Sequence, residues 1–122
     1  MSTTTQAKQQ AYRFGLWAEW VCILRLWLSG HRILARRMRN PFGEIDLIAK
    51  RANIIVFIEV KARQSLEDGL HALSTQQQQR IMKSASSWLA SHPKYAGLDM
   101  RFDLMVVTNP FRVRTIKHAF EG

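Results

Sequence analysis

The 122-residue chain contains few residues that cross-link or interrupt a fold: one cysteine, three prolines and six glycines. A single cysteine, Cys22, excludes an intramolecular disulfide and a zinc site built from cysteines. Because Cys22 lies in an apolar run, we expect a buried, inert thiol, and the chain suits a reducing cytoplasm.

Acidic residues are also scarce. Nine Asp and Glu residues stand against 18 Lys and Arg residues, which gives a formal net charge of +9. A small domain with that imbalance usually meets a polyanion such as nucleic acid, although a basic surface kept for solubility has the same composition. The hydrophobic fraction of 47% argues against disorder and is sufficient for a core.

The chain also lacks a long, uninterrupted hydrophobic run. Residues 14–28 are strongly apolar, but Glu19 and Arg25 interrupt them, and the run is shorter than the roughly 20 residues that a membrane-spanning helix needs. Residues 1–10 are polar, with Lys8 as the only charged side chain, unlike a signal peptide. We therefore expect a core helix, no membrane association and a cytoplasmic location.

The spacing of apolar residues and turn signals predicts one α/β domain over residues 10–122 behind a flexible tail over residues 1–9. Three successive strands, a crossover helix and further strands predict a mixed central sheet flanked by helices. Residues 62–73 are expected to form a loop. The expected elements are helices over 10–29 and from Ser74 or Thr75 to about His92, and strands over 32–39, 44–50, 54–61, 101–108 and 112–117.

Two of the expected strands carry ionisable residues among β-branched ones. Because side chains alternate across a strand, Glu44 and Asp46 share one face of the first strand, and Glu59 and Lys61 share one face of the second. A tight hairpin between these strands would bring Asp46, Glu59 and Lys61 to one patch. Two carboxylates and an ammonium group can hold a divalent metal and act on a phosphate.

Hard oxygen ligands of this kind suit Mg²⁺ or Mn²⁺, with Asp46, Glu59 and the carbonyl of Val60 as candidate ligands. Lys61 could orient the nucleophile or stabilise developing negative charge. Two other interpretations remain open: an interior salt bridge between Lys61 and a carboxylate, and ordinary cross-strand ion pairs on a solvent-facing side.

Other charged residues are also candidates for particular roles. Glu19 is either a surface glutamate paired with a basic neighbour or a carboxylate pointing into the same cleft. Asp103 alternates with apolar residues, so we expect an inward-facing partner for an arginine or a backbone amide. Several basic residues are candidate phosphate contacts, which give affinity without sequence preference. These are Arg36, Arg37, Arg39, Arg63, Arg80 and Lys83.

These motifs carry a resemblance to a known family. The runs GEIDLIA at 43–49 and FIEVKAR at 57–63 resemble the signature of the YraN-like family of predicted endonucleases. That family belongs to the PD-(D/E)XK superfamily, with restriction enzymes and archaeal Holliday junction resolvases. GLWAE at 15–19 and RFD at 101–103 extend the likeness to about residues 12–107.

The resemblance implies a restriction endonuclease-like fold with an αβββαβ core and metal-dependent phosphodiester hydrolysis. It makes Asp46 and Glu59 metal ligands, Lys61 the catalytic lysine and Glu19 a further acid at the metal cleft. Where a lysine is expected early in the second helix, this chain has a glutamine run, with Gln77 or a neighbour at that position.

Two functions from different classes follow. The first is a Mg²⁺- or Mn²⁺-dependent endonuclease acting on DNA, including branched or damaged DNA, and by analogy a homodimer. The second is a non-catalytic nucleic-acid-binding module that keeps the nuclease fold. A weaker third option is a structural component of an assembly, docked through the tryptophan-rich first helix.

Overall fold

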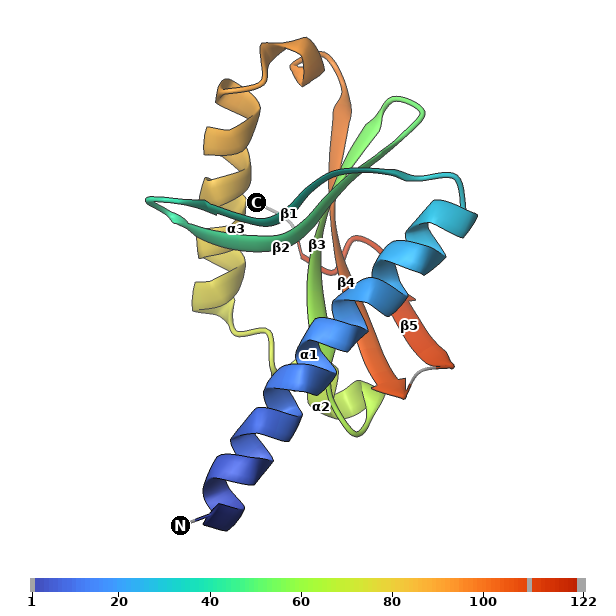
Figure 1. Ribbon diagram of the computed structural model, residues 1–122. Coiled ribbons are helices and arrows are strands. Elements are labelled where there is room, and N and C mark those ends of the chain that lie inside the picture. The colour runs from blue at the N-terminus through green and yellow to red at the C-terminus, as the bar shows by residue number, and fades with distance from the viewer. Residues whose placement is uncertain (1, 110, 121–122) are drawn as a thin grey trace.

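The computed structural model describes the backbone of residues 2–109 and 111–120, and the side chains from residue 15 onward within those ranges. Five strands and three helices follow one another, with a single 3₁₀ turn before the fourth strand (Figure 1). The elements are α1 (Ser2–Leu28), β1 (Arg32–Asn40), β2 (Gly43–Arg51), β3 (Ile54–Ala62), α2 (Leu66–His71), α3 (Thr75–Ala90), η1 (Pro93–Tyr95), β4 (Asp99–Asn109) and β5 (Arg112–Ile116).

The strands form one mixed sheet in the order β1-β2-β3-β4-β5. Neighbouring strands are antiparallel except β3 and β4, which are parallel and therefore need the crossover that α2 and α3 supply. The predicted α/β class with a mixed sheet is confirmed, and the arrangement is consistent with a restriction endonuclease-like core.

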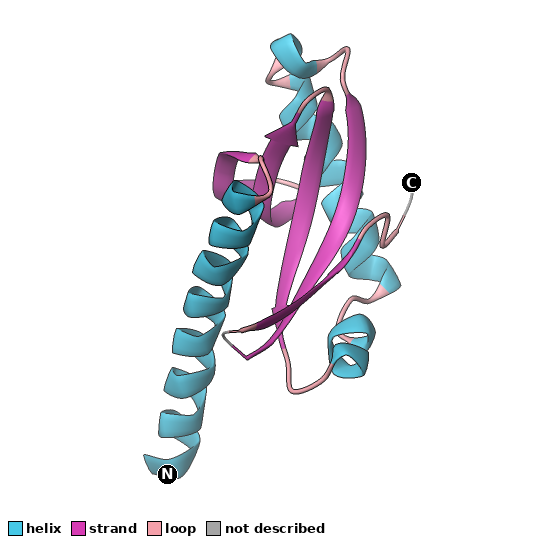
Figure 2. Ribbon diagram, turned by 90° about the vertical axis from the view of Figure 1, so that its right-hand side faces the viewer, coloured by secondary structure: helices cyan, strands magenta, loops and turns pink. Residues whose placement is uncertain are grey.

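Helices cover both faces of the sheet (Figure 2). On one face, α3 packs Ile81, Ala85 and Trp88 into a core that includes Phe57. On the other face, α1 buries a second stripe against the sheet, where Cys22 is fully buried. Because both faces are covered, β3 is buried over most of its length, and the charged residues near its end lie between two apolar layers.

The elements differ from the expectation in three places. Residues 66–71, expected as loop, form α2, whose first turn is capped by Oγ of Ser65, which accepts a hydrogen bond from the N–H of Asp68 at 3.1 Å. Residues 2–9, expected as a tail, continue the first helix in the same backbone conformation. Helix α3, the second of the two helices expected from the sequence, ends at Ala90 with Ser91 as its C-cap, slightly before the expected His92.

Within the segments that the structure describes, no helix combines the length and the hydropathy needed to cross a lipid bilayer.

Candidate functional site

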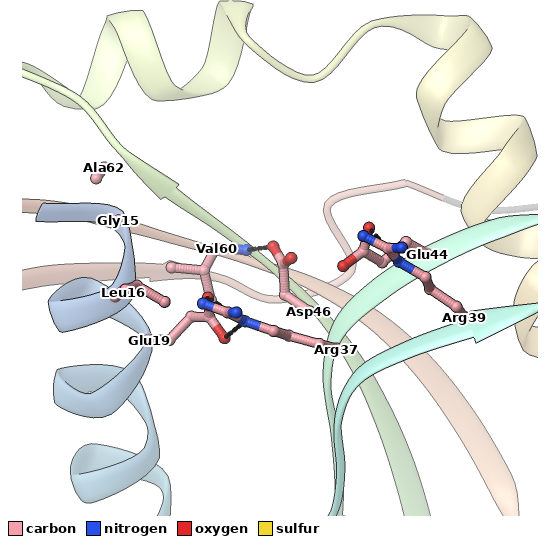
Figure 3. A pocket seen from close by; sticks show the side chains of 9 residues that line it. All are labelled: Gly15, Leu16, Glu19, Arg37, Arg39, Glu44, Asp46, Val60 and Ala62. Carbon is pink, nitrogen blue, oxygen red and sulfur yellow. Dashed lines mark hydrogen bonds and ion pairs between the residues drawn. The ribbon is translucent and has the colours of Figure 1, made fainter. Parts of the chain in front are cut away.

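A cavity of about 580 Å³ opens between α1 and the first three strands (Figure 3). Five charged side chains give it a polar character. Its lining consists of Gly15, Leu16, Glu19, Arg37, Arg39, Glu44, Asp46, Val60 and Ala62. Glu44 and Asp46 face the same cavity, so the predicted sharing of one strand face is confirmed.

Asp46 lies where β2 and β3 separate. The ladder between these strands ends at the pair Leu47 and Ile58, and beyond it Oδ2 of Asp46 accepts a hydrogen bond from the N–H of Val60 at 2.8 Å. Ile45 and Leu47, two residues apart, enter opposite cores, so the regular alternation of β2 is broken at Asp46. The carboxylate thus replaces a strand partner and is held at the mouth of the cavity.

Glu59 is buried beside Asp46. Burial, a hydrogen bond to Asp46 and the negative charge of Asp46 raise the pKa of the Glu59 carboxyl to about 9, while the nearby Lys61 opposes the shift. The two predicted acids are therefore neighbours, and the burial of Glu59 beside Asp46 favours the protonated form of Glu59.

Lys61 leaves β3 on the side opposite Val60 and Ala62, which line the cavity. The hydrogen-bonding pattern sets the orientation of the Gln77 amide: its oxygen accepts from Nζ of Lys61 at 3.2 Å and its nitrogen donates to the carbonyl of Ala72 at 3.3 Å. Of the glutamine run in α3, Gln77 is the residue that reaches the predicted lysine.

Glu19 points into the cavity from α1 and is bound by an arginine. Nε of Arg37 donates to both carboxylate oxygens at 3.2 Å, and Nη2 donates to Oε2 at 3.1 Å. Arg37 has a backbone φ of +49°, in the left-handed region that non-glycine residues rarely occupy. Glu19 is buried, so this pair offsets the cost of enclosing its charge.

The six predicted phosphate contacts are spread over three regions. Arg37 and Arg39 line the cavity, and Arg39 also pairs with Glu44 at 3.4 Å. The guanidinium of Arg36 lies 4.2 Å from the ring centre of Trp20, on the outer surface of α1. The other three are exposed: Arg63 follows β3, and Arg80 and Lys83 lie one turn apart on α3. Of the six, Arg37 and Arg39 are thus the ones brought to the site.

The donor chemistry at the site fits a hard divalent cation. Asp46 and Glu59 lie side by side, and burial followed by the contact with Asp46 disfavours the charged form of Glu59, a cost that a bound cation would offset. No group of three or more His, Cys, Asp or Glu side chains within the described side chains is arranged to hold a metal. Asp46 and Glu59 would therefore be the side-chain ligands of such a cation, and water would complete its coordination.

The sequence did not predict that Arg37 binds Glu19. It did predict the kind of partner that Asp103 has. Arg37 was expected as a phosphate contact only; its left-handed backbone has no signal in the sequence. Asp103 accepts two hydrogen bonds from Arg101, at 2.8 and 2.9 Å, and one from the N–H of His118 at 3.3 Å, which confirms the expected inward-facing role.

Comparisons with known proteins agree with the motifs. Residues 18–107 match the model of the Uncharacterised protein family UPF0102. A UPF0102 protein of Rhodopseudomonas palustris (strain BisA53) is 46% identical over 112 residues, which cover 92% of this chain and 86% of that protein. The UPF0102 protein mlr4633 of Mesorhizobium japonicum is 45% identical over 117 residues, covering 95% and 93% respectively. The chain therefore belongs to the UPF0102 family, which is the YraN-like family that its strand motifs resemble.

Proposed function

We propose that this protein is a Mg²⁺- or Mn²⁺-dependent endonuclease that hydrolyses phosphodiester bonds in DNA. The observation that carries the proposal is the contact between the carboxyl groups of Asp46 and Glu59 at the point where their strands separate, with Lys61 two residues further along. Structural ion pairs do not require two like charges to be brought together in a buried position, whereas a cation site does.

Each residue has a distinct task in this proposal. Asp46 and Glu59 hold the metal, which when bound lowers the pKa of a water molecule and neutralises charge on the phosphate. Lys61, which shares a face of β3 with Glu59 and is held by Gln77, donates from that face to the oxygen that becomes negative in the transition state. Glu19 holds Arg37 at the cavity wall, where its guanidinium can meet a phosphate of the bound strand.

The second candidate is a non-catalytic module that binds nucleic acid. One observation favours it: Glu19, which the family resemblance makes a further metal-site acid, is occupied by Arg37. A module of this kind would bind DNA with a strong dependence on salt concentration and would show no hydrolysis with any divalent metal.

The test is a cleavage assay with plasmid and with branched DNA, in Mg²⁺, in Mn²⁺ and in EDTA. We expect metal-dependent cleavage that the Asp46→Asn variant loses, while Asp99→Asn, an exposed acid on β4, cleaves as the wild type does. Equal cleavage by the wild type and Asp46→Asn would overturn the assignment. DNA binding without cleavage in any metal would favour the second candidate. Sedimentation of the DNA complex would test the proposed homodimer.

A further inference from the structure

The β1–β2 hairpin ends in a turn that keeps an aromatic side chain in solvent. Phe42 is 51% exposed, and its N–H donates to Oδ1 of Asn40 at 3.0 Å. The side chain is therefore not needed to fill either core, and the Asn40 contact sets the backbone from which it projects.

The turn is fastened to α3. Nδ2 of Asn40 donates to the carbonyl of Ser84 at 3.0 Å, and Oγ of Ser84 donates to the carbonyl of Arg80 at 2.8 Å. At Gly43 the backbone approaches α3 so closely that a Cβ would lie 3.0 Å from Oγ of Ser84. Phe42 is thus held by a rigid support, so little ordering entropy is lost when it binds a partner.

Charged side chains lie beside this aromatic side chain and connect it to the site. Arg39 and Arg80 line the same surface groove as Phe42, together with Glu44, which pairs with Arg39 at 3.4 Å. Arg39 and Glu44 also line the cavity that holds Asp46, so one continuous surface runs from the site to the tip. Figure 3 shows Arg39 and Glu44 on the two hairpin strands beside Asp46.

The distance from Phe42 to Asp46 corresponds to only a few nucleotides of a DNA strand. Four residue steps separate Phe42 from Asp46, which spans at most about 14 Å of extended chain. Stacked nucleotides advance about 3.4 Å each along a strand, so the tip is no more than about four nucleotides from the site.

We propose that Phe42 stacks on an exposed base of the bound DNA, and that the preferred substrate is DNA with a branch or an end next to the cleavage position. In a continuous duplex both faces of each base are covered by its neighbours, whereas the last pair before a branch leaves one face open for an aromatic ring. The inference rests on the proposed function for the path of the strand to Asp46, but stacking itself needs no catalysis.

A second exposed phenylalanine of the same chain serves as the control for Phe42. The tripeptide Asn-Pro-Phe occurs again at residues 109–111, where Phe111 is 88% exposed and its N–H donates to Oδ1 of Asn109 at 2.9 Å. Asn109 ends β4 and Phe111 directly precedes β5, and these two strands lie on the other side of the molecule from the β1–β2 hairpin tip in Figure 1. Phe111 thus shares the local sequence and the asparagine contact of Phe42 and is even more exposed, but it differs in its position relative to the site.

The experiment measures binding of the full chain, in EDTA, to a DNA fork carrying 2-aminopurine as the last paired base, with a continuous duplex as reference. Loss of one base–aromatic stack weakens binding roughly fivefold to a hundredfold, so we expect that loss for Phe42→Ala on the fork. Phe42→Ala should also abolish the fluorescence change of 2-aminopurine. Phe42→Trp, Phe111→Ala and all binding to the duplex should be unchanged.

Equal binding of the fork by wild type and Phe42→Ala, or an equal loss in Phe111→Ala, would overturn the inference. Circular dichroism of both alanine variants shows whether the fold is kept, as the exposure of both side chains leads us to expect. Fork cleavage by the wild type in Mg²⁺ is scored separately. Stacking without cleavage contradicts only the nuclease proposal, and cleavage that is unaffected by Phe42→Ala contradicts only the stacking inference.

Discussion

Oδ2 of Asp46 accepts a hydrogen bond from the N–H of Val60 at 2.8 Å, so a side chain of one strand satisfies the backbone of the next where their ladder has ended. Val60 stands between the two other residues of the proposed site, Glu59 and Lys61. The same contact therefore fixes the separation of the strands and the direction in which both side chains leave β3.

The Asp46→Asn variant should lose activity and keep its fold. The amide oxygen of asparagine can still accept from Val60, so we expect the free energy of unfolding to change by less than about 1 kcal/mol. Cleavage should fall by about two orders of magnitude or more, because a neutral amide no longer attracts the cation. Urea unfolding and single-turnover cleavage measure the two effects. A large loss of stability would mean that the charge of Asp46, and not its oxygen, supports the strand.

Glu59 makes the stability of the metal-free protein depend on pH. Its folded pKa of about 9 exceeds its ordinary value of 4.5, so between these values the folded protein keeps a proton that the unfolded chain releases. The free energy of unfolding should therefore fall as pH rises from about 5 to about 9, with the full contribution present below about 4.5. Glu59→Gln, which cannot titrate, should show a shallower slope in urea titrations with EDTA. Identical slopes in the two proteins would contradict this.

Gln77 should act through Lys61. We expect Lys61→Met to lower the cleavage rate by about two orders of magnitude and Gln77→Ala by about one, because the ammonium group loses the oxygen that orients it. The variant carrying both changes should be no slower than Lys61→Met alone. Gln76→Ala, which changes an exposed neighbour, should leave the cleavage rate unchanged. Additive losses in the double variant would show that Gln77 acts independently.

The Glu19–Arg37 pair decides between two roles for Glu19. If Glu19 serves to hold Arg37, then Glu19→Gln and Arg37→Met should each lower the free energy of unfolding by about 1–2 kcal/mol, with a smaller loss in the double variant than the sum. Titration of Mn²⁺ should then give the wild-type affinity for Glu19→Gln. An affinity that falls in Glu19→Gln but not in Arg37→Met would instead restore Glu19 as a metal ligand.

Gly69 should tolerate no larger residue. A Cβ there would lie 2.5 Å from both methyl groups of Val106, which is fully buried in β4. We expect Gly69→Ala to lower the free energy of unfolding by about 1–3 kcal/mol, since the helix or the strand must move. Gly97→Ala, where no atom lies within 4 Å of the new carbon, is the matched control. Equal stability of the two variants in urea would contradict the close packing of α2 on the sheet.

The sequence was informative where structure is local. Glu44 and Asp46 share a face because side chains alternate along a strand, and Asp46 meets Glu59 because a two-residue turn, Ala52-Asn53, joins their strands. Both relationships follow from spacing alone.

The rest depended on tertiary contacts. Helix α2 is too short to show a helical period and contains Gly69, and it packs directly on β4. Glu19 and Arg37 are 18 residues apart, and the left-handed backbone at Arg37 could not be inferred from an arginine. Likewise, the choice of Gln77 among four successive glutamines is made by the position of α3 relative to β3.

The arginines of β1 have a second consequence, because β1 is an outer edge of the sheet. The unpaired N–H and C=O groups of an edge strand can form hydrogen bonds with a strand of another molecule, which leads to aggregation. A row of like charges on the edge strand commonly prevents this pairing. Replacing Arg32, Arg36, Arg37 and Arg39 together would remove the proposed DNA contacts and that protection at once. We expect such a variant to self-associate, so light scattering should accompany any measurement of its lost affinity for DNA.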